Sequence, residues 1–223
     1  PSISSALVLD AQTQPGWSGV PLLELNGSGA GAGSDGFTIT SANNVVRGFV
    51  INRFNGDGVY LTGAGASDNV VAGNYIGVNA SGTASAGNGG YGIQIRSGAS
   101  NNIIGGTSAA ARNVISGNGS AGIRIRDAAS TGNGIVGNYI GLNAAGTGAL
   151  GNAAEGVLVN NSASNNIIGG TGAGAGNHIW YNGGDGVVVT SNAADGNSIL
   201  ANSISSNTGL GIDLGNNGVT ANN

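Results

Sequence analysis

The sequence predicts an all-β fold, a single-stranded right-handed parallel β-helix (a β-solenoid) with three short strands in each coil. Its first support is internal repetition. The stretch Gly73–Gly77 returns 64 residues later as Gly137–Gly141, and Asn101–Thr107 returns at the same spacing as Asn165–Thr171. Its second support is that short Val- and Ile-rich runs alternate with Gly and Asn clusters, which are strand and turn signals. Units this small cannot bury their own apolar faces, so they must stack on one another.

The first 42 residues are predicted to supply N-terminal strands and coils. Leu7–Leu9 and Leu22–Leu25 are short apolar runs bounded by turn residues, and Phe37–Thr40 alternates apolar and polar residues. All three patterns predict strands. The regular repeats occupy residues 43–223, and we expect the two parts, 1–42 and 43–223, to form one continuous domain.

Six repeat units follow, each with three β-like runs in the same order. The first runs are Val45–Val46, Val70–Val71, Ile103–Ile104, Ile135–Val136, Ile167–Ile168 and Ile199–Leu200. The second runs are Val50–Ile51, Tyr75–Val78, Val114–Ile115, Tyr139–Leu142, His178–Trp180 and Ser203–Ile204. The third runs are Gly58–Leu61, Gly92–Ile95, Gly122–Ile125, Gly156–Val159, Gly186–Val189 and Gly211–Leu214. With the N-terminal segment, about seven to eight coils should stack at a spacing of about 4.8 Å.

Long connections recur at fixed places in the repeat. Ala80–Gly87 and Ala144–Gly151 separate the second run from the third, and Thr107–Arg112 and Thr171–Gly176 separate the first run from the second. These segments should form loops at the corners of the coils.

One set of asparagines falls three residues after the inward-facing Ile of the second run. Asparagine tolerates left-handed backbone conformations, and its amide can pair with the amides above and below. We therefore predict a structural ladder at one corner, with a polar binding stripe as the alternative. The set is Asn79, Asn118, Asn143, Asn182 and Asn207.

Composition excludes several function classes. Only 7% of the residues are charged, the net charge is -4, and Lys and Cys are absent. The negative charge argues against nucleic acid as a partner, and Gly and Asn interrupt every apolar run before it reaches membrane-spanning length. His178 is the only histidine, so His-based triads and multi-His metal sites are excluded. We expect no cofactor and no metal.

The paired motifs Gly-Asn-Tyr-Ile-Gly and Asn-Asn-Ile-Ile-Gly-Gly-Thr resemble those of the parallel β-helix repeat proteins of bacterial secretomes, which often carry a CSLREA domain. The resemblance covers about residues 43–215. It implies a pectate-lyase-like fold and an extracellular or cell-surface location. Many members look like secreted scaffolds, and a shared fold does not transfer an activity.

The candidates for catalysis are Glu155 and Asp185. Each precedes the Gly of a third run in adjacent coils, so the two carboxylates should lie roughly 5 Å apart. Retaining glycosidases hold their carboxyl groups at about 5–5.5 Å. Solvated turns and weak cation binding are the alternatives. A polysaccharide lyase would need a basic residue near such acids. The candidates are Arg96 and Arg126, which share one outward column of the third run. Arg126 stands beside Asp127, and we interpret that pair as a surface ion pair.

The candidates for binding are Tyr75, Tyr139, His178 and Trp180, which alternation places on the outward side of the second run. Such a stripe is either covered by the long loops or serves as a contact surface for sugar rings or another protein.

The favoured hypothesis is a non-enzymatic extracellular structural scaffold. No amphipathic helix marks either terminus as a cap, and open β-helix ends can pair with other copies of the chain into a filament, sheath or surface layer. The alternatives are a carbohydrate-binding or adhesion module that uses the aromatic stripe, and a polysaccharide lyase or glycosidase.

Overall fold

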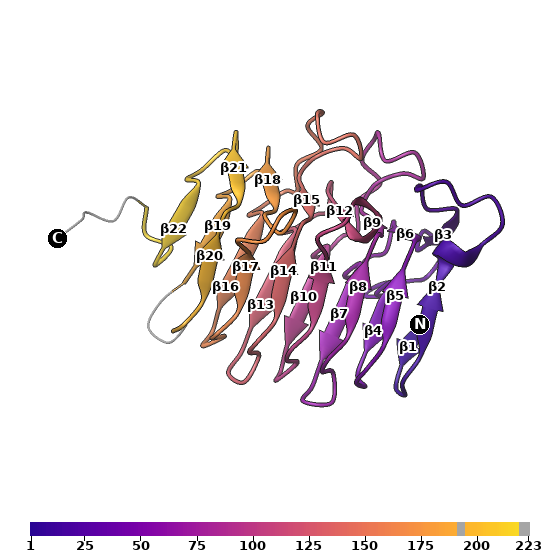
Figure 1. Ribbon diagram of the computed structural model, residues 1–223, viewed down its shortest axis with the longest axis horizontal. Coiled ribbons are helices and arrows are strands. Elements are labelled where there is room, and N and C mark those ends of the chain that lie inside the picture. The colour runs from indigo at the N-terminus through magenta and orange to yellow at the C-terminus, as the bar shows by residue number, and fades with distance from the viewer. Residues whose placement is uncertain (191–194, 219–223) are drawn as a thin grey trace.

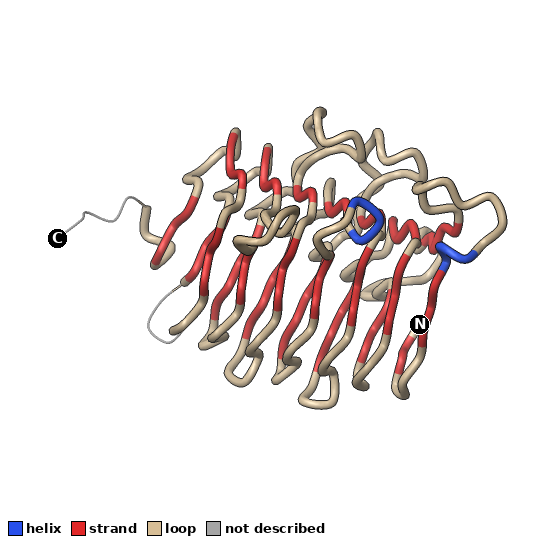
Figure 2. Tube along the Cα trace, viewed as in Figure 1, coloured by secondary structure: helices blue, strands red, loops and turns tan. Residues whose placement is uncertain are grey.

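The computed structural model describes residues 1–190 and 195–218. Within them the chain forms a parallel β-helix of seven coils, in which each coil contributes one strand to each of three parallel sheets (Figures 1 and 2). Every strand pairing is parallel, as the repeat predicts. Two single-turn 3-10 helices interrupt the corners, η1 (Ala11–Thr13) and η2 (Ala109–Ala111). No helix in the described part of the chain is long and apolar enough to cross a membrane.

The three sheets follow the three predicted runs. Sheet A contains β1 (Ser2–Ile3), β4 (Phe37–Ile39), β7 (Val59–Thr62), β10 (Ile93–Arg96), β13 (Ile123–Arg126), β16 (Val157–Asn160), β19 (Val187–Val189) and β22 (Ile212–Leu214). Sheet B contains β2 (Val8–Asp10), β5 (Val45–Arg47), β8 (Val70–Ala72), β11 (Ile103–Gly105), β14 (Gly134–Val136), β17 (Ile167–Gly169) and β20 (Ser198–Leu200). Sheet C contains β3 (Leu23–Asn26), β6 (Phe49–Asn52), β9 (Tyr75–Ile76), β12 (Val114–Ile115), β15 (Tyr139–Ile140), β18 (His178–Trp180) and β21 (Ser203–Ser205).

The N-terminal segment builds the first coil in register with the repeats. Leu9 pairs with Val46 and Leu25 with Ile51. Strand β1, which the sequence pattern does not reveal, adds an eighth strand to sheet A. It is only two residues long, so it leaves no alternation to detect.

The core is a column of β-branched and Leu side chains inside the coils. The predicted inward residues of the second run, from Ile51 to Ile179, are fully buried, as are Leu61, Ile95 and Ile125 of the third run. The last coil differs, because among the described residues no strand stacks beyond it. Ile204 is only partly buried, and Leu214 is 58% exposed.

Close approach between coils requires glycine after the Tyr-Ile pair. Gly77 and Gly141 have φ angles of 86° and 89°, in the left-handed region that favours glycine. A Cβ atom at either position would also collide with a backbone oxygen of the next coil, that of Ser116 or Trp180. The repeated Gly-Asn-Tyr-Ile-Gly motif is therefore a requirement of stacking.

Asparagine ladders line all three corners of the coils, where the sequence predicted one. In each ladder an Nδ2 donates to the Oδ1 of the asparagine one coil further on, at 2.8–3.2 Å. The ladder between sheets C and A contains Asn88, Asn118, Asn152, Asn182 and Asn207. The ladder between sheets A and B contains Asn44, Asn69, Asn102, Asn133, Asn166 and Asn197. The ladder between sheets B and C contains Asn74, Asn113, Asn138, Asn177 and Asn202.

The prediction for the first ladder was right at Asn118, Asn182 and Asn207 and wrong at Asn79 and Asn143. These two asparagines close the long loops instead. The Oδ1 of Asn79 accepts from the N–H groups of Thr83 and Ala84 at 2.9 and 3.2 Å. Asn143 does the same within its own loop. Because the loops are inserted before the corner, Asn88 and Asn152 take the ladder positions.

Candidate functional site

The outer face of sheet C carries the predicted aromatic stripe, and its N-terminal part is covered. Val50 and Val114 are buried, and Tyr75 is only 9% exposed. They pack with Val78, while Ala144 and Leu150 contact them from above. The expectation that Tyr75 offers an exposed binding surface was therefore wrong, and the loop-cover alternative holds at this end of the sheet.

The covering loops support each other. Residues 79–87 and 143–151 each fold back through an antiparallel bridge, Val78 with Ser85 and Leu142 with Ala149. The N–H of Ala144 donates to the carbonyl of Gly82 at 2.9 Å, which ties one loop to the other. In Figure 1 loops project from the upper edge of the rod over its N-terminal and middle coils. The face beyond them, around β18, is more open.

There the stripe becomes a stack of rings, which we call the aromatic row: Tyr139, His178 and Trp180. The ring centroids of Tyr139 and His178 lie 5.2 Å apart, and those of His178 and Trp180 lie 5.8 Å apart with the planes at 26°. All three side chains are half-buried. The strands beneath them hold the rings in fixed positions, since Tyr139 and His178 are direct neighbours in the register.

Polar groups fix the two ends of the aromatic row. The guanidinium carbon of Arg112 lies 4.3 Å from the Tyr139 ring centroid, and its Nη1 donates to the Tyr139 hydroxyl at 3.2 Å. The Trp180 indole N–H donates to the backbone oxygen of Ser203 at 3.0 Å. Burial and the positive charge of Arg112 both lower the pKa of His178 below its ordinary value. The imidazole is therefore neutral at pH 7, and its ring is available for stacking.

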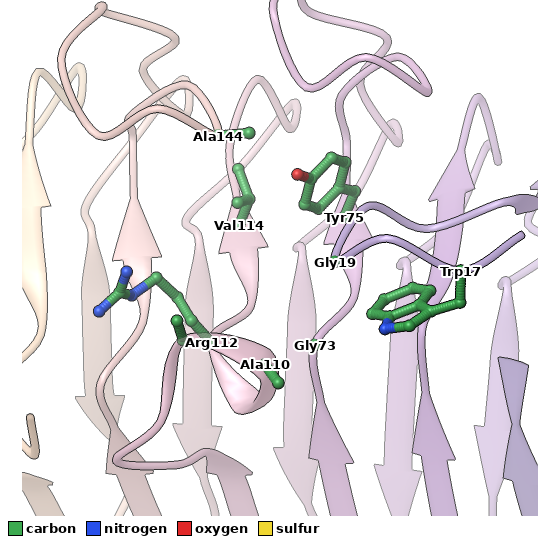
Figure 3. A pocket seen from close by; sticks show the side chains of 9 residues that line it. Trp17, Gly19, Gly73, Tyr75, Ala110, Arg112, Val114 and Ala144 are labelled. Carbon is green, nitrogen blue, oxygen red and sulfur yellow. The ribbon is translucent and has the colours of Figure 1, made fainter. Parts of the chain in front are cut away.

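Two hollows flank the aromatic row. One, of about 190 Å³, is lined by Trp17, Tyr75, Arg112 and Val114, and Figure 3 shows the Trp17 indole on the opposite side from Arg112. The other, of about 270 Å³, lies beside His178 and includes Asn177 and Ser203. Trp17 was missed in the sequence analysis. It lies between β2 and β3, and its signal was an isolated Trp in a Pro- and Gly-rich loop of a chain with two Trp residues.

Glu155 and Asp185 occupy equivalent turns of adjacent coils, as the sequence predicts, because the N–H of Gly156 donates to the Asp185 carbonyl at 2.9 Å. The Asp185 carboxylate accepts from the backbone N–H of Leu210 in the next coil. Asp57 has the same role nearer the N-terminus, accepting from the N–H of Tyr91 at 2.7 Å. The contact of Asp185 thus matches the turn alternative. The described residues contain no group of three or more His, Cys, Asp or Glu side chains that could hold a metal ion.

No protein-family model and no curated protein matches the sequence. A solved structure does match: a mutant form of the periplasmic alginate epimerase AlgG superposes with a TM-score of 0.53 and 18% sequence identity. The superposition covers 80% of this chain and 34% of the epimerase, so the chain spans about a third of that protein's length. The fold and the likeness define the chain as a parallel β-helix protein. No comparison shows the CSLREA-associated family.

Proposed function

We propose that the protein is a non-catalytic carbohydrate-binding module that holds a glycan chain along the aromatic row. The main support is the geometry of the aromatic row, in which three half-buried rings on neighbouring strands contact one another. Tyr and Trp present an apolar face and a polar edge, which suits the faces and hydroxyls of a sugar ring. Rings fixed on strands also lose little conformational freedom on binding.

The surroundings supply the few polar groups that such a site needs. Binding sites are mostly apolar with a small number of placed hydrogen-bonding groups. Ser203 lies in the hollow beside His178, and Arg112 lies at the other end of the row. A sugar stacked on Trp180 would have Ser203 at its edge, and a sugar stacked on Tyr139 would have Arg112 at its edge.

The structural neighbour acts on alginate, and it is periplasmic. At 18% identity that likeness concerns the fold, so it adds no residue to the proposal. A location at the cell surface or outside the cell fits a glycan-binding role.

Replacement of Trp180 by Ala should lower the affinity for a bound glycan about tenfold, which corresponds to about 1.4 kcal/mol. The indole supplies the largest stacking surface of the row. Titration calorimetry against glycans selected on an array measures the loss. Tyr60→Ala is the matched control, because Tyr60 is a half-buried aromatic residue on the outer face of sheet A. Binding of a neutral glycan that survives Trp180→Ala and Tyr139→Ala unchanged would remove the proposal.

A second candidate function, the self-associating scaffold, is favoured by apolar side chains exposed on the two outermost coils. Leu9 in the first coil is only partly buried although Val46 and Val71 of its column are fully buried. Leu214 in the last coil is 58% exposed although Leu61, Ile95 and Ile125 of its column are fully buried. A coil of the same geometry would cover them, either as a further coil of a longer chain or as a second copy of this one.

If copies stack end to end, the purified chain should form concentration-dependent rods, visible by electron microscopy and by light scattering. Leu214→Lys should prevent this growth by placing a charge in the contact. Ile167→Lys should not, because Ile167 is 45% exposed on the outer side of sheet B in the middle of the rod. A chain that stays monomeric at high concentration contradicts this role.

A further inference from the structure

The outer face of sheet A concentrates the positive charge of the protein. Three of its six basic residues lie there on neighbouring strands, Arg96 on β10 and both Arg124 and Arg126 on β13. We call them the arginine patch. Ile95 pairs with Ile125, so the next residues, Arg96 and Arg126, stand side by side about one strand spacing, ~4.8 Å, apart.

One carboxylate joins two of these arginines. The Nε of Arg126 lies 2.9 Å from Oδ1 of Asp127, and the Nε of Arg96 lies 3.4 Å from Oδ2. The contacts through Nε leave the outer Nη groups of both guanidinium groups without a hydrogen-bond partner among the described residues. The two side chains are 35% and 24% exposed, so these donors are accessible from solvent.

The third arginine is held by neutral partners. Nη1 of Arg124 donates to the Tyr91 hydroxyl at 2.8 Å, and the guanidinium carbon lies 5.1 Å from the Tyr91 ring centroid. Its Nε donates to Oδ1 of Asn160 at 3.4 Å. No carboxylate hydrogen-bonds to Arg124 in the described part of the chain. Asp57 interacts with Arg124 only by the Coulomb attraction between their charges. Three guanidinium charges therefore face at most two carboxylates, and the patch stays positive.

We infer that the arginine patch binds the oxyanion groups of an acidic polysaccharide. Paired Nη groups match the planar fork of a carboxylate, and they also accept the oxygens of a sulfate ester. Asp127 offsets only one of the two positive charges of Arg96 and Arg126, so a further anion at their outer Nη groups is still attracted. The site goes beyond the proposed function, because it lies on another sheet and recognises the charged groups of a glycan. The aromatic row recognises the faces of its sugar rings.

An acidic glycan fits the patch better than a nucleic acid does. Affinity for a duplex grows with the number of phosphates neutralised by cations. This chain has a net charge of -4 and places only three arginines on the face, so it would repel a long stretch of phosphates. A flexible glycan can place one or two acidic groups on the patch and leave the rest of its length in solvent.

The test measures binding of polygalacturonate, dextran sulfate, neutral dextran and single-stranded DNA by affinity electrophoresis and calorimetry. The protein should bind polygalacturonate or dextran sulfate, with affinity that falls as salt rises, and bind neutral dextran at least tenfold less tightly. Preference between the two polyanions identifies carboxylate or sulfate as the group recognised. Tighter binding of DNA than of both acidic glycans would overturn the inference.

The double variant Arg96→Gln/Arg126→Gln should lose at least tenfold in affinity for the acidic glycan. The matched control is Arg47→Gln/Arg53→Gln, which removes the same charge from two more exposed arginines paired with Asp10 and Glu24. An equal loss of affinity in the two double variants would mean that the net charge of the protein alone determines binding, which would contradict a specific site. Urea unfolding of each variant checks that it still folds. Arg124→Gln tests the third arginine of the patch independently of the double variant. The Arg96→Gln/Arg126→Gln variant should keep the wild-type affinity for a neutral glycan bound at the aromatic row, so this result separates the patch from the aromatic row.

Discussion

Replacement of Asn138 by Ala should lower the free energy of unfolding by about 3–6 kcal/mol. The side chain is fully buried. Its Nδ2 donates to the Ile104 carbonyl at 2.9 Å and to Oδ1 of Asn177 at 3.0 Å. Its Oδ1 accepts from the backbone N–H and the Nδ2 of Asn113 at 3.3 and 2.9 Å. Alanine would leave several of these groups buried without a partner, and each costs about 1–3 kcal/mol.

Urea denaturation of the purified variants gives the comparison. Asn143→Ala is the matched control, because it removes the same side chain from a loop. Its Oδ1 accepts from Thr147 and Gly148 at 3.0 Å, and both contacts are only partly buried or exposed. We expect a loss of about 1 kcal/mol there, similar to that of a lost cap. Equal destabilisation by the two variants would contradict a stabilising ladder.

The ladders show how much of the corner geometry the sequence contains. Counting forward from the inward Ile finds Asn118 but fails where a nine-residue insertion separates Asn79 from Asn88 and Asn143 from Asn152. Counting backward from the third strand finds all five members of this ladder: Asn88, Asn118, Asn152, Asn182 and Asn207 each lie five residues before its first residue. The ladder position depends on the strand that follows the corner, and an insertion before the corner does not change that distance.

The other two ladders had an equally local signal. Their asparagines stand directly before the first strand residue, as Asn102 does before β11 and Asn138 before β15. Repeat periodicity and alternation were enough to predict the coils and their inward columns. These features follow from backbone pairing between neighbouring coils, which each unit encodes locally.

The binding surface was less predictable because it depends on which loops meet above the sheet. Tyr75 and Tyr139 occur in identical Gly-Asn-Tyr-Ile-Gly motifs. Tyr75 is buried beneath the joined loops, whereas Tyr139 is half-buried and contacts His178 and Arg112. Contacts between segments far apart in sequence decide the difference. Gln12 donates to the Ala110 carbonyl at 2.8 Å, for example, and joins the first coil to η2.

Replacement of Asp57 by Asn should stabilise the protein at pH 7 and leave its stability almost unchanged at pH 4. Burial, the dominant cause, raises the pKa of Asp57 to about 6. The hydrogen bond from the Tyr91 N–H and the charges of Arg124 and Arg96 lower that pKa, while the charge of Asp35 raises it. An amide oxygen at this position can still accept from the Tyr91 N–H, so the substitution removes mainly the cost of ionisation.

The sign follows from proton linkage. Below about pH 4 both the folded and the unfolded protein hold the Asp57 proton. Between about pH 4 and pH 6 the unfolded chain has lost it and the folded protein keeps it, so rising pH favours unfolding. The penalty reaches at most about 3 kcal/mol, at roughly 1.4 kcal/mol per pKa unit, and is constant above pH 6. The asparagine side chain of the variant does not titrate and avoids this loss.

Urea unfolding of the wild type and the variant at pH 4, 5, 6, 7 and 8 measures the difference, which should grow between pH 4 and 6 and then level off. Asp127→Asn is the control, for which the change in stability with pH should have the opposite sign. Although burial acts to raise the pKa of Asp127, its hydrogen bond with Arg126 and the charges of Arg126 and Arg96 bring that pKa below its ordinary value. Its ionised form stabilises the fold, so Asp127→Asn should be more damaging at pH 7 than in acid. A pH-independent effect of Asp57→Asn would mean that Asp57 ionises in the folded protein as easily as in the unfolded chain.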